Sequence, residues 1–222
     1  MLGSSAFMFS TIPWQSAPLA EAAWVALGAY LLGCFNTGFY LVRLKQKNDI
    51  RSLGSGNAGA RNVGRVLGWP GFVLTLIGDA GKGALAVWTT RHFFPVDSLM
   101  AIAVLAVVAG HIWPAQLKFH GGKGMATTMG ALWVLDFRLV VGVGLAFILP
   151  WIILRKTVLP GLFGVCLLPL MGFYLGHSPV LNLWLTILAI LVLAAHRKNL
   201  VTEVSRFVAA RHPTVKEKHT ES

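Results

Sequence analysis

Long apolar stretches, separated from one another by short polar or glycine-rich loops, fill most of the chain. The first, from about residue 22 to residue 42, is long enough to cross a hydrocarbon core of ~30 Å as a helix that rises ~1.5 Å per residue. Hydrophobic residues make up 55% of the 222 residues and charged residues only 12%, which is too apolar for an ordinary soluble domain. The sequence therefore predicts an all-α integral membrane protein.

We expect about seven transmembrane helices in one membrane domain that covers residues 1–205. The predicted segments span about residues 22–42, 66–94, 98–117, 125–135, 139–154, 158–176 and 180–195. The fourth is too short to cross the core upright, and the second contains a charged, glycine-rich interruption at 78–83 that needs a reason. Residues 1–18 are expected to form an exposed N-terminal tail, because they lack the basic start of a signal peptide, and residues 206–222 a basic, polar C-terminal tail.

The distribution of basic residues indicates how these helices are oriented. If the first segment ends in the cytoplasm, 16 of the 19 Lys and Arg residues fall on the cytoplasmic side. They are Arg43, Lys45, Lys47, Arg51, Arg61, Arg65, Lys118, Lys123, Arg155, Lys156, Arg197, Lys198, Arg206, Arg211, Lys216 and Lys218. Only Arg91 and Arg138 fall on the opposite side, and Lys82 lies within the second segment. Because cytoplasmic loops carry the excess of positive charge, we predict an outside N-terminus, a cytoplasmic C-terminus and an odd number of spans.

One cytoplasmic loop, from Gly54 to Arg65, is rich in glycine, amide and basic residues. Glycines let backbone N–H groups approach a ligand, and amide and basic side chains add donors and charge, a combination suited to phosphate. The residues expected to bind there are Ser55, Gly56, Asn57, Gly59, Asn62 and Arg65. A plain surface turn is the alternative. The G-x-G-x-x-G match that begins at Gly54 does not indicate a dinucleotide-binding fold, because no βαβ unit surrounds it.

Two ionisable residues lie inside the second apolar segment. Asp79 and Lys82 are three residues apart, so they share one face of a helix. Ionisable groups at this depth are costly, usually paired and often functional. Two interpretations stay open, a structural ion pair that holds helices together and a part of a substrate site.

A second glycine-rich loop follows the third apolar segment. His111 precedes it, and within it Gly121, Gly122 and Gly124 flank Lys123. A lysine among uncovered backbone amides suits phosphate, although the spacing is not that of a nucleotide P-loop. A flexible turn between helices is the alternative.

The last apolar segment ends in a short polar motif on the same side of the membrane. Arg197 and Lys198 are ordinary topological anchors after a transmembrane helix. His196 and Asn199 are not needed for anchoring, and both side chains can orient hydroxyl or phosphate oxygens.

In this order and on one face, these motifs resemble the PlsY family of bacterial membrane acyl-phosphate:glycerol-3-phosphate acyltransferases. The resemblance covers about residues 24–200 and rests on residues 54–65, 79–83, 110–127 and 196–199. It implies a seven-span fold in the bacterial cytoplasmic (inner) membrane, with the active site on the cytoplasmic face. It also implies transfer of a fatty acyl group from acyl phosphate to the sn-1 hydroxyl of glycerol 3-phosphate, giving lysophosphatidic acid and phosphate in the first step of phospholipid synthesis. No cofactor or metal is implied, and neither a coenzyme A thioester nor acyl carrier protein is the immediate donor.

The resemblance and the chemistry of two phosphate-bearing substrates together define the expected site. Acyl phosphate is already activated, so positioning and charge neutralisation can supply catalysis. We expect catalytic roles for Lys123, Arg65, His196 and Asn199. The expected substrate-binding residues are Ser55, Gly56, Asn57, Gly59, Asn62, Asp79, Lys82, His111, Gly122 and Arg197. The proton of the attacking hydroxyl is expected to pass to the donor phosphate, to His111 or to His196.

One residue of the first loop departs from the family. Arg61 stands where the family usually has threonine, and it adds a cation beside the expected phosphate site.

Other functions fit the sequence less well. A membrane transporter for phosphate or an organophosphate is the main alternative, because broken helices and basic loops also line anion paths, but the chain shows no inverted repeat. A phosphotransferase would need aspartates clustered for Mg²⁺, whereas Asp49, Asp79, Asp97 and Asp136 are far apart in sequence. The net charge of +11 does not indicate nucleic-acid binding, because the basic residues form short clusters between apolar runs. The expected partners are therefore acyl phosphate, glycerol 3-phosphate and the lipid bilayer.

Overall fold

A computed structural model describes residues 18–211, and every regular element in that range is helical. The elements are α1 (Leu19–Cys34), α2 (Thr37–Gln46), η1 (Ile50–Ser52), α3 (Ala60–Phe93), α4 (Asp97–Ile112), η2 (Ala115–Leu117), α5 (Met125–Leu154), α6 (Val158–Cys166), α7 (Leu168–Tyr174), α8 (Pro179–Ala195) and α9 (Arg197–Arg211), where η marks a 3₁₀ turn. The predicted all-α class is thus confirmed for this range. Most of the two predicted tails, residues 1–17 and 212–222, lies outside the described residues, and the predicted boundary at residue 205 falls inside α9.

Four helical stretches are long and apolar enough to cross a membrane. They are residues 19–46, which join α1 and α2, then α3, residues 97–117 and α5; α8 with the start of α9, bent by 62°, would make a fifth. The predicted fourth and fifth segments both lie in α5, on either side of Asp136, whose backbone leaves the helical region (φ −158°, ψ 107°). The count of seven spans and the orientation of the termini stay predictions.

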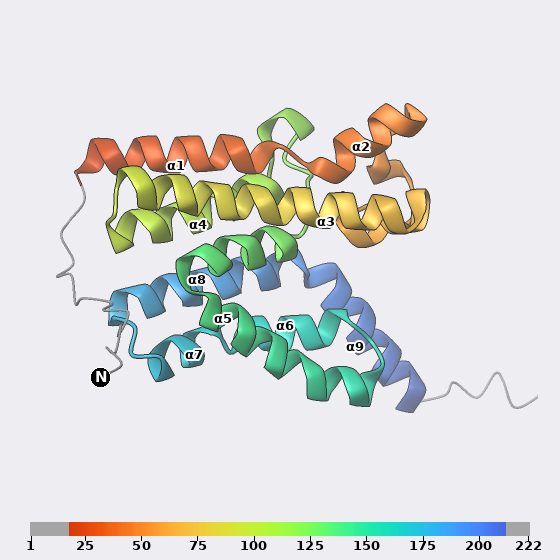
Figure 1. Ribbon diagram of the computed structural model, residues 1–222. Helices are drawn as coiled ribbons and strands as arrows, with labels where there is room; N and C mark the ends of the chain where they lie inside the picture. Colours follow the sequence, from red (N-terminus) through yellow and green to blue (C-terminus); the bar gives the residue numbers. More distant parts are fainter. Residues whose placement is uncertain (1–17, 212–222) are drawn as a thin grey trace, which may run out of the picture.

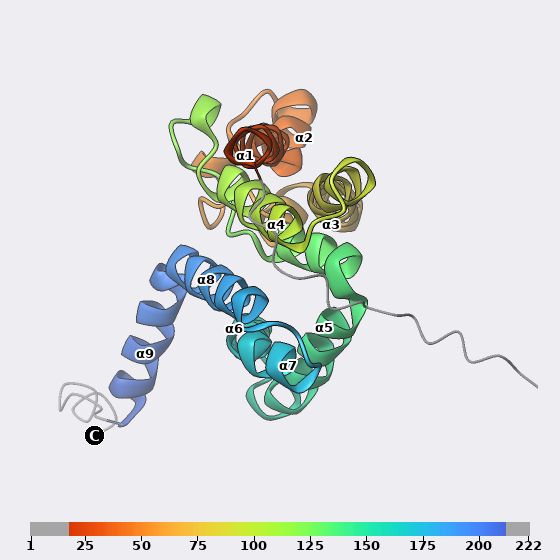
Figure 2. The same ribbon diagram turned by 90° about the vertical axis from the view of Figure 1, so that its left-hand side faces the viewer.

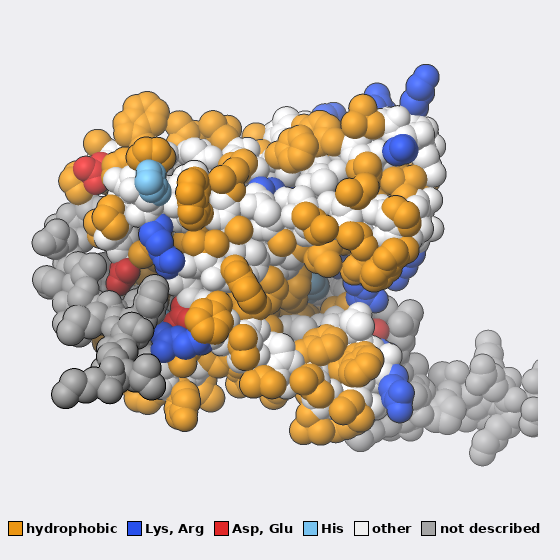
Figure 3. All heavy atoms as spheres, in the orientation of Figure 1, with side chains coloured by type: hydrophobic (Ala, Val, Ile, Leu, Met, Phe, Trp, Pro, Cys, Tyr) orange, Lys and Arg blue, Asp and Glu red, His pale blue; other side chains and the backbone are white. Residues whose placement is uncertain are grey.

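The helices form two groups that α5 connects (Figures 1 and 2). In one group α4 packs against α1 and α3, and in the other α8 packs against α6 and α7, while α5 contacts both α3 and α6. The larger of two buried apolar clusters in the described residues runs through α1, α3, α4, α5, α6, α7 and α8, and the smaller one consists of Val42, Ile50, Ala58 and Val63. Outside this core, large apolar side chains cover much of the surface (Figure 3). Such a surface is typical of a protein whose solvent is lipid.

The glycine-rich interruption in α3 does not break the helix. Residues 78–83 stay helical, and the one non-helical residue within α3 is Gly68. A Cβ atom on Gly83 would overlap the carbonyl oxygen of Thr127 in α5, and one on Gly78 would lie 2.6 Å from the side chain of Thr37. The reason for the interruption is therefore close helix packing, because only glycine lets the neighbouring backbones come this near.

This packing predicts opposite outcomes for two glycines of the same motif. Gly83→Ala should lower the Tm of the detergent-solubilised protein by at least ~3 °C, because the new methyl group forces α3 and α5 apart. Gly81→Ala is the matched control, since a Cβ atom there meets nothing within 4 Å, and its Tm should stay equal or rise slightly. Equal Tm values for the two variants, measured by thermal unfolding, would contradict the close packing.

Gly68 folds the start of α3 back on the helix that follows. Its φ of 72° is left-handed, which glycine adopts without strain. A Cβ atom on Gly71 would lie 3.2 Å from Cγ1 of Val63, although residues eight apart in a straight helix are separated by ~12 Å. The break therefore turns the N-terminus of α3, into which the first glycine-rich loop leads, back along the helix that follows.

Candidate active site

The first glycine-rich loop is built around the side chain of Asn62. Its Oδ1 atom accepts a hydrogen bond from the backbone N–H of Ser55 at 2.8 Å, and its Nδ2 atom donates to the carbonyls of Leu53 at 2.8 Å and Ile50 at 3.3 Å. Only 1% of Asn62 is exposed, whereas Ser55 and Gly56 are exposed. The structure thus gives Asn62 a role in shaping the loop, and substrate binding by this residue stays a prediction.

The loop leads into an uncapped helix N-terminus. Gly59 is the N-cap of α3, and no side chain caps the first turn. Arg61 and Arg65 are four residues apart at this end of the helix, so they share a face, and both are exposed. Unpaired N–H groups, the positive end of the helix dipole and two guanidinium groups together favour an anion here.

Asp79, Lys82 and His111 form a buried network between α3, α4 and the break that separates α1 from α2. Lys82 Nζ lies 3.0 Å from Asp79 Oδ1 and 2.8 Å from His111 Nδ1, and it donates to the carbonyl of Phe35 at 2.5 Å. The three side chains are between 1% and 5% exposed. Lys82 therefore satisfies a backbone carbonyl that the helix break leaves unpaired within the apolar region.

The second glycine-rich loop rests directly on His111. The N–H of Gly122 donates to the His111 carbonyl at 3.0 Å, and a Cβ atom on Gly122 would overlap the imidazole ring. Gly124, with φ 83°, is the N-cap of α5, which also begins without a side-chain cap. The buried network thus supports the loop that carries Lys123, and this loop ends at a second uncapped helix N-terminus.

Lys123 joins the two groups of helices. Its Nζ atom donates to Oδ1 of Asn199, which belongs to α9. Burial lowers the pKa of Lys123, and the positive charges of Arg61, Lys198 and Arg65 lower it further. None of these four cations forms an ion pair with a carboxylate in residues 18–211. The arrangement leaves a concentrated positive charge without a described counter-ion, which an anionic ligand would supply.

His196 lies at the junction of α8 and α9 and is 6% exposed. Its Nδ1 atom lies 2.8 Å from the carbonyl oxygen of Val192. A carbonyl can only accept, so Nδ1 carries the proton, and in the neutral ring Nε2 is the atom with a lone pair. Lys123 and Arg61 are close enough to act on this ring electrostatically.

The structure brings several of the sequence-predicted residues together and separates others. Lys123 is hydrogen-bonded to Asn199, the charge of Arg65 acts on Lys123, and the charge of Lys123 acts on His196. Ser55, Gly56, Asn57 and Gly59 form the loop at the N-terminus of α3, and Arg197 is exposed at the start of α9. Asp79, Lys82 and His111 lie apart from the exposed loops in the buried network, with their polar atoms turned toward one another. A substrate-binding role for these three stays a prediction.

Sequence reasoning underestimated two cations. Lys198 is predicted to be only a topological anchor and Arg61 to add a cation beside the first phosphate site, and neither is among the predicted site residues, yet both act on Lys123. The spacing of Arg61 and Arg65 on one helical face is a signal that could have placed Arg61 in the site. In residues 18–211 no group of three or more His, Cys, Asp or Glu side chains is placed to hold a metal ion. That the protein works without a metal stays a prediction.

Comparison with known proteins connects this site to a family. Residues 23–205 match the family model described as glycerol-3-phosphate acyltransferase. Glycerol-3-phosphate acyltransferase 1 of Desulfitobacterium hafniense (strain Y51) is 44% identical over 174 residues, which cover 78% of this chain and 86% of that protein. The glycerol-3-phosphate acyltransferase of Gluconobacter oxydans (strain 621H) is 39% identical over 208 residues, which cover 89% and 94%.

Two crystal structures share the fold. They are structures of PlsY (YgiH), an integral membrane glycerol 3-phosphate acyltransferase, in its glycerol 3-phosphate form and its lysophosphatidic acid form. The TM-scores are 0.78 and 0.74 at 29% sequence identity, and the match covers 83% of this chain and 92% of PlsY. With the matches in sequence and in structure, the chain belongs to the PlsY family of membrane glycerol-3-phosphate acyltransferases.

Proposed function

We propose that this protein transfers a fatty acyl group from acyl phosphate to the sn-1 hydroxyl of glycerol 3-phosphate, giving lysophosphatidic acid and inorganic phosphate. The reaction takes place at the cytoplasmic face of a bacterial inner membrane and needs no cofactor. The observation that carries the proposal is the group formed by Arg61, Arg65, Lys123 and Lys198, which lies beside two uncapped helix N-termini. Two phosphate-bearing substrates require such an arrangement, and a transporter for a single anion does not.

The reaction requires one bond to form and one to break at the acyl carbon. The sn-1 hydroxyl oxygen of glycerol 3-phosphate attacks this carbon, the bond between the carbon and the phosphate oxygen breaks, and phosphate leaves with its electron pair. Negative charge therefore grows on the departing phosphate, where Lys123 and Arg65 offset it. The loop from Ser55 to Gly59 holds the donor phosphate through its remaining backbone N–H groups, because those of Ser55 and Gly56 already donate to Asn62 Oδ1 and to the Leu53 carbonyl.

Glycerol 3-phosphate binds on the α9 side of the site, between Lys123, Asn199 and His196. Asn199 fixes the ammonium group of Lys123 through its Oδ1 atom. The attacking hydroxyl can then donate to Nε2 of His196, the ring nitrogen that its bond to Val192 leaves unprotonated. Positioning of this kind converts an encounter of two substrates into a reaction between neighbours.

The contacts of His111 argue against this residue as the proton acceptor. His111 Nδ1 faces the Lys82 ammonium and must accept from it, so the neutral ring carries its proton on Nε2 and has no lone pair to offer. The hydroxyl proton therefore passes either to the departing phosphate, which makes the reaction substrate-assisted, or to His196.

A direct assay tests the function. Purified protein in detergent is incubated with an acyl phosphate and glycerol 3-phosphate in the presence of EDTA, and phosphate and lysophosphatidic acid are measured together. Equal amounts of the two products, with the acyl group on the sn-1 oxygen, are expected. Parallel reactions receive an acyl coenzyme A or acyl carrier protein thioester in place of acyl phosphate and should give no product.

Other outcomes would change the assignment. Phosphate without lysophosphatidic acid would indicate hydrolysis of the donor, and product from a thioester would identify a different donor. If intact protein and intact donor give neither product, the proposed reaction is wrong. Uptake of labelled phosphate or glycerol 3-phosphate by proteoliposomes would then support the transporter.

The lowered pKa of Lys123 predicts how the reaction responds to pH. If Lys123 must be protonated, kcat/KM should fall as the pH rises through its pKa, and this fall should begin below the range of an ordinary lysine. Arg61→Gln removes a positive charge that disfavours protonated Lys123, so the alkaline fall of kcat/KM should move to higher pH. The measurement is kcat/KM at subsaturating glycerol 3-phosphate across alkaline pH.

Lys45→Gln is the control for this pH shift. Lys45 is an exposed cation of α2, and it is not among the groups that lower the pKa of Lys123. The alkaline fall of kcat/KM in Lys45→Gln should occur at the same pH as in the unchanged protein. If Arg61→Gln leaves this fall at the same pH, Lys123 is not the titrating group.

A further inference from the structure

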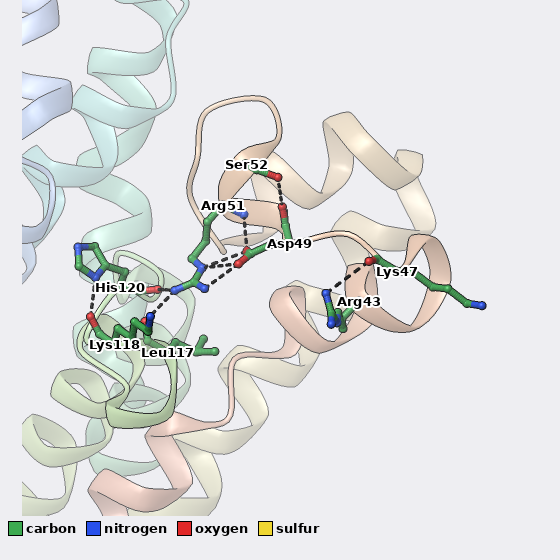
Figure 4. A network of polar contacts seen from close by, with 8 residues as sticks. All are labelled: Arg43, Lys47, Asp49, Arg51, Ser52, Leu117, Lys118 and His120. Carbon is green, nitrogen blue, oxygen red and sulfur yellow. Dashed lines mark hydrogen bonds and ion pairs between the residues drawn. The ribbon is translucent and has the colours of Figure 1, made fainter.

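The guanidinium group of Arg51 connects the segments that lead into the two glycine-rich loops (Figure 4). Arg51 lies in η1, just before the first loop, and its Nη1 atom donates to the carbonyl of Leu117 at 2.7 Å and to that of His120 at 3.4 Å. Both carbonyls belong to the turn that precedes Lys123. The connection joins segments that are 66 and 69 residues apart in the chain.

Asp49 holds this guanidinium in a fixed orientation. Its carboxylate accepts from Nε of Arg51 at 3.0 and 3.1 Å, from Nη2 at 2.6 Å and from the backbone N–H of Arg51 at 2.9 Å. The ring of Phe39 lies below the guanidinium, with 5.3 Å between Cζ and the ring centroid. Only an arginine has the donors and the planar geometry to satisfy the carboxylate and the Leu117 carbonyl together.

The turn that Arg51 contacts is strained and needs support from outside. Lys118 and Phe119 are consecutive non-glycine residues with left-handed backbones, at φ 55° and 59°. Such residues persist where surrounding contacts hold them in place. Arg51 supplies these contacts on both sides of the pair, at Leu117 before it and at His120 after it.

The other end of the connection reaches the first loop through Asn62. Asn62 Nδ2 donates to the carbonyls of Ile50, in η1, and Leu53, just after it. Asn62 Oδ1 accepts from the backbone N–H of Ser55. The turn before Lys123 is therefore connected to Ser55 by the hydrogen bonds of Arg51, the short backbone segment of residues 50–53 and the hydrogen bonds of Asn62.

We propose that Arg51, oriented by Asp49, is a positioning residue that holds the two phosphate-binding loops in register, so that donor phosphate and Lys123 meet in the geometry that transfer requires. The inference rests on the proposed function, because the loops act together only if the two substrates react between them. Arg51 itself contacts neither substrate in this scheme. Its removal should therefore affect turnover more strongly than binding.

The test compares Arg51→Lys with a matched change at Arg43. Both substitutions keep a positive charge, and within residues 18–211 the Arg43 side chain donates only to the carbonyl of Lys47, at 3.4 Å, away from the two loops (Figure 4). Arg51→Lys should lower kcat at least ~10-fold with little change in the KM of glycerol 3-phosphate, since small misplacements of reacting groups are costly. Asp49→Asn should act in the same direction, and Arg43→Lys should keep the kinetics of the unchanged protein.

Two further measurements separate positioning from a general loss of folding. Hydrogen exchange of the amides in residues 115–124 should become faster in Arg51→Lys than in Arg43→Lys, while exchange in the core of α4 stays unchanged in both. In the Lys123→Ala background, Arg51→Lys should lower the remaining kcat by less than ~3-fold, because the group that it positions is missing.

The outcomes distinguish this inference from the proposed function. If the unchanged protein makes no lysophosphatidic acid, the proposed function fails, whereas the exchange measurement still reports whether Arg51 holds the loops together. If the unchanged protein is active and Arg51→Lys matches Arg43→Lys in kcat and exchange, the inference is wrong. The inference is also wrong if Arg51→Lys lowers kcat as strongly in the Lys123→Ala background as in the unchanged protein, because Arg51 would then act independently of Lys123.

Discussion

Replacing Lys123 with alanine is expected to lower kcat by at least ~100-fold, because the site then lacks the ammonium group that offsets charge on the departing phosphate. Lys123 is the cation that the structure places between the two helix groups, hydrogen-bonded to Asn199 in α9. Arg61, Arg65 and Lys198 remain in the variant and keep the site positive. Substrate should therefore still bind, and the loss should appear mainly in kcat. Initial rates of lysophosphatidic acid formation at several substrate concentrations measure both constants.

Lys118→Ala is the matched control for this substitution. Lys118 is an exposed lysine at the turn before the same loop, and Arg51 contacts the backbone on either side of it. Its side-chain amine takes part in no hydrogen bond or ion pair within residues 18–211, so its replacement should leave kcat within ~3-fold of the unchanged value. Near-normal turnover of the Lys123 variant would remove this lysine from the mechanism.

The second large effect concerns stability. Asp79→Asn should lower the free energy of unfolding in detergent by about 3–5 kcal/mol, because it leaves the Lys82 ammonium buried without its carboxylate. Asp79 and Lys82 are 1% and 5% exposed, and their charged atoms are 3.0 Å apart. The remaining partners of Lys82, the Phe35 carbonyl and His111, are neutral hydrogen-bond acceptors and do not neutralise its charge.

A double variant tests whether the cost arises from the unpaired charge. Asp79→Asn combined with Lys82→Met removes both charges. The double variant should therefore lose less free energy of unfolding than the two single variants lose in sum. Equilibrium unfolding monitored by tryptophan fluorescence measures all four proteins. Additive losses would show that each residue contributes separately and that the ion pair is not the source of stability.

Several features of this protein could be predicted because they depend on short stretches of sequence. The ion pair between Asp79 and Lys82 follows from helical periodicity alone, since residues three apart share a face. The break at Asp136 falls between two predicted apolar segments, where a charged residue interrupts the hydrophobic pattern. In both cases residues close in sequence decide the outcome.

Other features could not be predicted because they depend on how distant segments pack. The residues at 78–83 looked like an interruption, yet the helix continues, and Gly83 faces the backbone of α5 near Thr127. Substrate binding by Asn62 stays a prediction, but the local pattern did not indicate that its amide holds the loop together from inside. Nothing in the local pattern distinguishes a glycine that meets a ligand from one that meets another helix.

The sequence by itself determined that the protein is helical and apolar, which residues repeat on each helical face, and which loops carry glycine and positive charge. These properties follow from hydrophobic periodicity and backbone freedom, which act over a few residues. Only the tertiary structure decided that Lys123 meets Asn199, 76 residues away, that His111 supports the loop above it, and that Arg51 joins the two loops. Such meetings depend on the angles at the helix breaks and on close packing between helices, and both are properties of the whole bundle.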